Sequence, residues 1–127
     1  MGSVPWEVVI GLALALFLTG PLVRGPRFVP RLAVENASPH TLTVSATTPR
    51  HDGWTIVGIV GARTSTPFRE VIDQGRTWVF RVSGSSGPGV EFTVSRPQLV
   101  QSGWRVTIPD DVQRRLRDAG ASPDPGL

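Results

Sequence analysis

The chain has 127 residues and no cysteine, which allows one small domain but excludes a disulfide framework, a thiolate metal site and a cysteine nucleophile. It is far shorter than a TIM barrel, which needs about 250 residues. Its 13 basic residues, all arginine, and its 10 acidic residues leave a formal net charge of +3, which is too small to indicate a nucleic-acid-binding protein.

An apolar segment near the start of the chain predicts a membrane anchor that, with its basic flank, covers residues 1–30. The sixteen residues 8–23 carry no charge and would form a helix about 24 Å long, against a hydrocarbon core of about 30 Å. Adding residues 4–7 extends this helix to the length of a single-pass span. Aromatic and basic side chains favour membrane interfaces. The residues expected at the interface are Trp6, Arg24, Arg27 and Arg31.

A cleaved signal peptide and a soluble core helix are the alternatives to this anchor. A signal peptide normally has a basic n-region and a small-residue cleavage site, and this N-terminus matches neither pattern. Arginine flanks favour the cytoplasmic side of a membrane, so the three arginines after the apolar run favour a domain on the cytoplasmic face. An extracytoplasmic domain is the close alternative, because the margin is only three charges.

From residue 31 onward, short runs of alternating apolar and polar residues recur between turn signals, which is typical of β-strands. Their spacing predicts a mainly β domain over residues 31–109. We expect a seven-stranded antiparallel sandwich of immunoglobulin-like type, with a small barrel as the alternative. Residues 61–67 and 84–89 are expected to be loops. The seven strands are expected at residues 31–36, 40–47, 54–60, 68–73, 76–82, 90–96 and 103–108.

A short amphipathic helix is expected over residues 110–120, followed by a flexible tail at residues 121–127. Asp110 or Asp111 is expected to cap this helix, because acidic side chains favour a helix N-terminus. Gly120 fits the position at which a helix ends. The apolar side of the helix would be formed by Val112, Leu116 and Ala119.

The predicted strand 54–60 is apolar on both faces. Trp54, Ile56 and Val60 alternate on one face, and further apolar side chains lie out of phase with the presumed core. The C-terminal helix could cover them, or they could be buried in a central strand. Otherwise they form an exposed patch that binds a partner. The candidate partner patch consists of Val57, Ile59, Val71 and Val79.

Residue types that carry catalysis are sparse, and we predict no catalytic residue, metal ligand or cofactor site. The two histidines are His40 and His51, whereas a zinc site needs three or four ligands. His51 adjoins Asp52, so a membrane-attached hydrolase with a His51-centred site, using Asp52 or a loop serine, is the alternative function. A sugar- or lipid-binding sandwich is a further alternative, which requires an exposed tryptophan.

The stretch VIDQGRTWVFRV at residues 71–82, with the apolar segment and the LAVEN and SPH stretches upstream, resembles small uncharacterised membrane-anchored proteins of high-GC Gram-positive bacteria that carry a single β-sandwich domain. The resemblance covers about residues 8–118 and implies no activity and no site residues. Together with the apolar segment, it leads to one functional hypothesis. The chain is expected to be a non-catalytic binding or assembly module, whose partners are the lipid bilayer and another membrane or envelope protein, and not nucleic acid.

Overall fold

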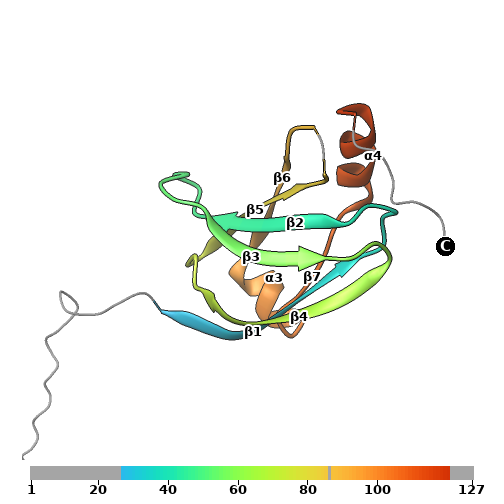
Figure 1. The fold of residues 1–127 in the computed structure, drawn as a ribbon. Coiled ribbons are helices and arrows are strands. Elements are labelled where there is room, and N and C mark those ends of the chain that lie inside the picture. The colour runs from blue at the N-terminus through green and yellow to red at the C-terminus, as the bar shows by residue number, and fades with distance from the viewer. Residues whose placement is uncertain (1–26, 86, 121–127) are drawn as a thin grey trace, which may run out of the picture.

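Two β-sheets pack face to face in the computed structural model, which describes residues 27–85 and 87–120 (Figure 1). One sheet has the strand order β4-β1-β7 and the other the order β3-β2-β5-β6. The elements in chain order are β1 (Phe28–Asn36), β2 (Leu42–Thr47), β3 (Thr55–Val60), β4 (Thr64–Ile72), β5 (Thr77–Ser83), β6 (Val90–Ser95), α3 (Arg96–Gln101), β7 (Arg105–Thr107) and α4 (Asp110–Asp118).

One apolar core fills the space between the two sheets, and it confirms the mainly β prediction. Leu32 and Val34 of β1 and Leu42 of β2 have no exposed surface, as the alternation of these strands predicts. Trp78 of β5 is also fully buried, and its ring lies 5.8 Å from that of Phe80, centroid to centroid. Large apolar side chains from both sheets therefore stabilise the sandwich, since each fully buried one contributes about 1.5–3 kcal/mol.

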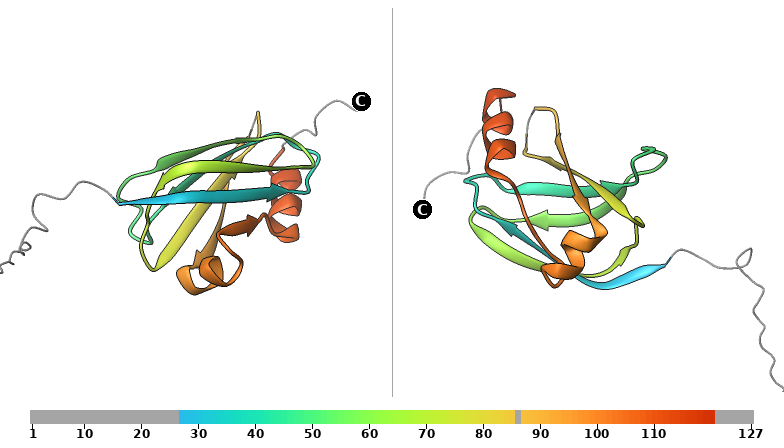
Figure 2. Two further views of the ribbon diagram at one scale, coloured as in Figure 1. Left: turned by 90° about the horizontal axis from the view of Figure 1, so that it is seen from below. Right: turned by 180° about the vertical axis from the view of Figure 1, so that it is seen from behind.

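The prediction of a purely antiparallel sandwich is wrong at one strand pair. Strands β1 and β7 are parallel, with Val34 opposite Val106, whereas the other pairs are antiparallel. After β6 the chain passes through α3 to the opposite sheet, where β7 runs in the same direction as β1 (Figure 2). The strand orders also differ from the ABED and CFG orders of a constant-type immunoglobulin domain, so the likeness is limited to two packed sheets.

Helix α3 occupies part of the connection between the last two strands, where no helix was expected. Ser95 caps it: its hydroxyl oxygen accepts from the backbone N–H of Gln98 at 3.3 Å, and its own N–H donates to the Gln98 side chain at 2.8 Å. This reciprocal arrangement is a capping box, and it is followed by proline in the first turn. Leu99 is the residue of α3 that is buried in the core.

Strand β4 begins at Thr64, four residues before its predicted start, so part of the expected loop 61–67 is strand. Thr64 pairs with Asn36 and Pro67 pairs with Ala33 of β1. The threonine and serine content of this segment is typical of turns, but β-branched threonine also fits a pleated strand. Because this segment pairs with the long strand β1, it forms a strand and not a turn.

Helix α4 confirms the predicted C-terminal helix and packs beside β6 at one end of the sandwich (Figure 2). Val112 and Leu116 are at most 1% exposed and belong to the core. The guanidinium of Arg115 donates to the backbone oxygen of Glu91 in β6 at 2.8 Å. The helix therefore closes the core as well as covering part of β6.

The predicted cap of this helix is wrong, whereas its predicted end is confirmed. The N-cap is Pro109, which makes no side-chain cap hydrogen bond. Asp110 and Asp111 instead lie in the first turn, where their negative charges interact favourably with the positive end of the helix dipole. Gly120 follows the helix with φ of +97°, a conformation that glycine adopts without strain.

The predicted anchor segment, including Trp6 and Arg24, lies outside the described residues, as does the tail at 121–127. Neither helix of the described residues, α3 with six residues or α4 with nine, could span a bilayer. Arg27 and Arg31, the two predicted interface residues that the structure describes, are both exposed near the beginning of β1.

Candidate functional site

The four residues of the candidate partner patch do not share one exposed surface. Val71 and Val79 are each only 5% exposed, so the prediction is wrong at these two positions. Val57 packs partly buried against the core, whereas Ile59 is 64% exposed. Ile56, which alternation would direct to the core, is 74% exposed. The exposed apolar pair of this region is therefore Ile56 and Ile59, both on β3.

A β-bulge explains why these two isoleucines, three positions apart, lie on the same face. The register between β3 and β2 shifts by one residue between Ile56 and Gly58, and Val57 is the extra residue. A bulge inserts one residue and so changes which side chains face outward. A Cβ at Gly58 would lie only 2.2 Å from the ring of Phe68 in β4, so glycine permits the close approach of the two strands. The exposed isoleucine pair thus depends on a bulge and on a glycine.

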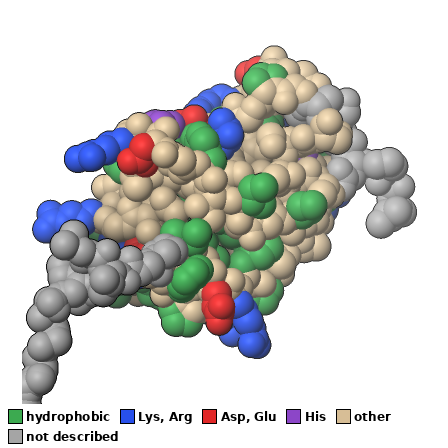
Figure 3. All heavy atoms as spheres, turned by 60° about the vertical axis from the view of Figure 1, so that its left-hand side comes forward, with side chains coloured by type: hydrophobic (Ala, Val, Ile, Leu, Met, Phe, Trp, Pro, Cys, Tyr) green, Lys and Arg blue, Asp and Glu red, His purple; other side chains and the backbone are tan. Residues whose placement is uncertain are grey.

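Strand β3 is also an uncharged free edge. It pairs with β2 on one side, and no strand of residues 27–85 or 87–120 pairs with its other side. Its sequence TIVGIV has no charge and no proline, although natural edge strands are commonly protected by charges, proline or short length. On the face drawn in Figure 3, hydrophobic side chains form separate spots in the upper part and gather more closely in the lower part.

The other three edges in the described part carry the protection that β3 lacks. Strand β4 contains Pro67, Arg69 and Glu70. Strand β7 is only three residues long, and β6 is in contact with both α3 and α4. The protection of β3 is limited to the bulge and to the close approach of β4 near Gly58, so among the described strands this edge is the best candidate for adding a strand from another chain.

His51, the centre of the alternative catalytic site, contacts Glu91 of β6 rather than Asp52. Its Nε2 lies 3.0 Å from the carboxylate of Glu91, and its Nδ1 lies 3.1 Å from the backbone oxygen of Pro49. Both partners are acceptors, so this geometry favours a ring protonated on both nitrogens. The hydrogen bond to Glu91 correspondingly raises the pKa of His51. A doubly protonated ring cannot accept a proton from a nucleophile. Asp52 instead accepts from the Thr48 hydroxyl at 3.0 Å.

The tryptophan that a sugar- or lipid-binding surface would need is partly covered. Trp54 is half-buried, the guanidinium of Arg81 lies 4.0 Å from its ring centre, and His51 contacts it edge-on at 5.6 Å between centroids. Trp104 packs against the core. Among the described residues, no three His, Asp or Glu side chains are grouped as metal ligands.

The turn at residues 73–76, with the sequence DQGR, is joined to α3 through an ion pair. Arg96 of α3 donates to the Asp73 carboxylate at 2.6 Å and to the Gly75 backbone oxygen at 3.2 Å, and its guanidinium lies over the ring of Trp104. The Gly75 N–H also donates to Asp73 at 2.8 Å. Burial alone would raise the pKa of Asp73, but the hydrogen bonds from Arg96 and Gly75 together have the larger effect. The net result is a lowered pKa.

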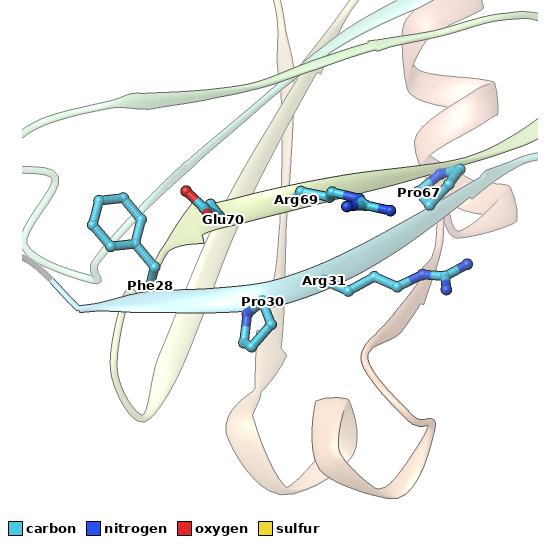
Figure 4. A pocket seen from close by; sticks show the side chains of 6 residues that line it. All are labelled: Phe28, Pro30, Arg31, Pro67, Arg69 and Glu70. Atoms are coloured by element: carbon cyan, nitrogen blue, oxygen red, sulfur yellow. The ribbon is translucent and has the colours of Figure 1, made fainter.

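A groove on the outer face of β1 and β4 brings together residues that the sequence separates (Figure 4). Arg31 and Arg69 are direct cross-strand partners, and Figure 4 shows both side chains extending toward Pro67. Phe28, which is 53% exposed, lies at the other end. The groove has a volume of about 610 Å³. Sequence reasoning identified Arg31 but missed Arg69, because only the β1–β4 register reveals that the two are adjacent.

Comparisons of this chain with protein-family models, with curated proteins and with solved structures gave no significant match. The resemblance to small membrane-anchored proteins therefore stays a prediction.

Proposed function

We propose that the chain is a membrane-tethered, non-catalytic binding module that takes up an extended segment of another membrane or envelope protein at the free edge of β3. The tether is the uncharged run at residues 8–23, which lies a few residues before the first strand of the domain. The arginines after it favour the cytoplasmic face in this proposal. The main support for this proposal is the uncharged, free edge of β3.

An edge strand can bind an extended peptide by continuing the sheet. Its unpaired N–H and C=O groups supply the main-chain hydrogen bonds, and side chains that alternate along the strand supply specificity. On β3 those outward side chains are Ile56 and Ile59, which are 74% and 64% exposed. A segment that pairs here would cover both and so remove apolar surface from water. At about 25 cal/mol per Å² of apolar surface, this burial favours binding.

Tethering supports a membrane or envelope protein as the partner. A module held at the bilayer meets other membrane-held chains at a high effective concentration, so a short strand contact is sufficient for association. The alternative function, hydrolysis at His51, has less support because both ring nitrogens already have acceptor partners at 3.0 and 3.1 Å.

Site-specific photocrosslinking of the full chain in native membranes tests this proposal. A photoreactive residue at Ile56 or Ile59 should crosslink to the same protein species. The matched control is Val100 of α3, which is 57% exposed and should give no such product. Ile59→Lys should abolish the crosslink from position 56, because a charge blocks an edge, whereas Val100→Lys should leave it unchanged.

Three results would overturn the proposal. The same products at Ile56 and at Val100 would mean that contact is not specific to β3. A crosslink between two copies of this chain would replace the proposed partner by self-association. Recovery of the intact full chain in the supernatant after membranes are sedimented would refute the tether, and a reporter fused after Leu127 would identify the side of the membrane.

A further inference from the structure

The β1–β4 outer face places two like charges directly opposite each other. Arg31 of β1 pairs in register with Arg69 of β4, both side chains are exposed, and they extend in the same direction (Figure 4). Like charges at directly opposite positions destabilise a sheet. An anion bound across the two guanidinium groups would relieve this repulsion.

No carboxylate of the described residues forms an ion pair with either of these two arginines. The ion pairs of that part of the chain involve Arg96, Arg105, Arg115 and His51, and neither Arg31 nor Arg69 is among them. Glu70 also lines the groove, so the three side chains carry a net charge of +1. The face therefore attracts anions, although Glu70 weakens the attraction.

Apolar side chains lie next to these charges on the same face. Phe28 is 53% exposed, and Pro30 and Pro67 line the groove with it. Figure 3 shows the same kind of surface, with hydrophobic, acidic and basic side chains side by side on the lower part of the face that it draws. A surface that combines an exposed aromatic ring with arginines is suited to the headgroup region of a bilayer.

The length of the preceding chain restricts where this face can lie relative to the anchor. Three residues separate Val23, the last residue of the apolar run, from Arg27, so four Cα–Cα steps join the two. At no more than 3.6 Å per residue, they span at most about 14 Å whatever their path. If the apolar run spans a bilayer, the start of β1 is held within about that distance of the membrane surface.

We infer that the β1–β4 outer face docks onto anionic phospholipid headgroups, with Arg31 and Arg69 contacting the phosphates and Phe28 entering the interface. This inference rests on the proposed tethering, and it assigns a membrane-facing side to the folded domain. The free edge of β3 is a separate surface, so one protein can use both contacts. Docking would fix the orientation in which β3 is offered to its partner.

Fluorescence quenching in reconstituted bilayers measures this docking with the full chain. The absence of cysteine allows one fluorophore to be attached at Ser65→Cys in β4, and another at Asp118→Cys in α4 as the distant control. Lipids with a nitroxide on the headgroup report how close each label lies to the membrane surface. The bilayers consist of phosphatidylcholine alone or of phosphatidylcholine with phosphatidylglycerol.

Phosphatidylglycerol should increase quenching at position 65 and leave position 118 unchanged. Each arginine near an anionic surface strengthens binding about 5-fold, so Arg31→Gln with Arg69→Gln should lower the ratio of docked to undocked protein about 30-fold. The matched control, Arg114→Gln with Arg117→Gln on α4, removes the same charge and should have no effect. Glu70→Gln should strengthen docking, and high salt should weaken it.

Equal quenching with and without phosphatidylglycerol, or equal effects of the two double variants, would overturn the inference while leaving the tether intact. A full chain that floats with phosphatidylglycerol vesicles but not with pure phosphatidylcholine vesicles would refute the tether and support the charged face. A full chain that floats with neither would refute both. Dimer formation that Arg31→Gln abolishes would identify a second copy as the occupant and overturn the inference.

Discussion

Replacing Asn36 tests how a buried amide holds one end of the sandwich together. Asn36 is 2% exposed, and its Nδ2 donates to the backbone oxygens of His40 at 2.7 Å and of Gly61 at 3.0 Å. Its Oδ1 accepts from the Ser38 N–H at 3.0 Å and from the Ser38 hydroxyl at 2.6 Å. One side chain thus joins the β1–β2 turn to the turn that follows β3.

Asn36→Ala removes these four contacts at a site that water cannot easily enter. Each intramolecular hydrogen bond contributes about 1 kcal/mol net, and a buried group left unsatisfied costs about 1–3 kcal/mol. We therefore expect the free energy of unfolding to fall by about 3 kcal/mol. With an m-value of about 1.5 kcal/mol per M for a small domain, the urea midpoint falls by about 2 M. Tryptophan fluorescence of the full chain in detergent micelles measures the transition.

Asn36→Asp separates loss of the donor from loss of shape, because aspartate is nearly isosteric. The ionised side chain cannot donate to the two backbone oxygens, so its folded-state pKa should rise above the unfolded value of about 3.9. The deficit in stability relative to the wild type should then be small at low pH and grow as pH rises through the raised pKa. A deficit of Asn36→Ala below about 0.5 kcal/mol, or a pH-independent deficit of Asn36→Asp, would refute the reasoning.

Three further predictions concern other contacts. The lowered pKa of Asp73 stabilises the fold above its unfolded pKa of about 3.9, and this contribution should disappear as pH falls through the folded value. Asp73→Asn should lose that pH-dependent component in urea unfolding. Gly58→Ala should lower the free energy of unfolding by about 2 kcal/mol, because the Phe68 ring occupies the space of the new methyl group. The pKa of His51, raised by Glu91, should fall toward 6.5 in Glu91→Gln, as measured by NMR titration.

Each of these predictions has a control or a contradicting outcome. Gly53 has no atom within 4 Å of its added Cβ, so Gly53→Ala should leave the melting temperature unchanged, and equal losses at both glycines would contradict the packing argument. Asp118 is exposed, so Asp118→Asn should retain the pH dependence that Asp73→Asn loses. An unchanged His51 titration in Glu91→Gln would show that the hydrogen bond does not form in solution.

Local alternation predicted most strands because burial of one face imposes a period of two residues. Leu42 and Val44, for example, lie in the core as expected. The same rule failed in β3, where the bulge turns Ile56 outward. Gly58 inside an apolar strand is the signal that could have indicated it, since an isolated glycine in a strand often marks a bulge.

Contacts between distant segments could not be predicted from local pattern. The opposition of Arg31 and Arg69 follows from the register of β1 with β4, and the ion pair of Asp73 with Arg96 follows from where α3 begins. That start had a readable signal, because Ser95 and Gln98 match a capping box followed by an apolar residue. A helix of six residues is too short for periodicity to reveal it.

The parallel pairing of β1 with β7 affects the order in which the domain can be completed during synthesis. Residues 105–107, which form β7, leave the ribosome about seventy residues after β1, and α4 follows still later. Until then the inner strand of the three-stranded sheet, β1, keeps one unpaired side, and Val34 lacks Val106 as its cross-strand neighbour. Non-local pairings of this kind slow folding. Strand β1 is therefore the first strand of the domain to be translated, but it is among the last to acquire all of its neighbours.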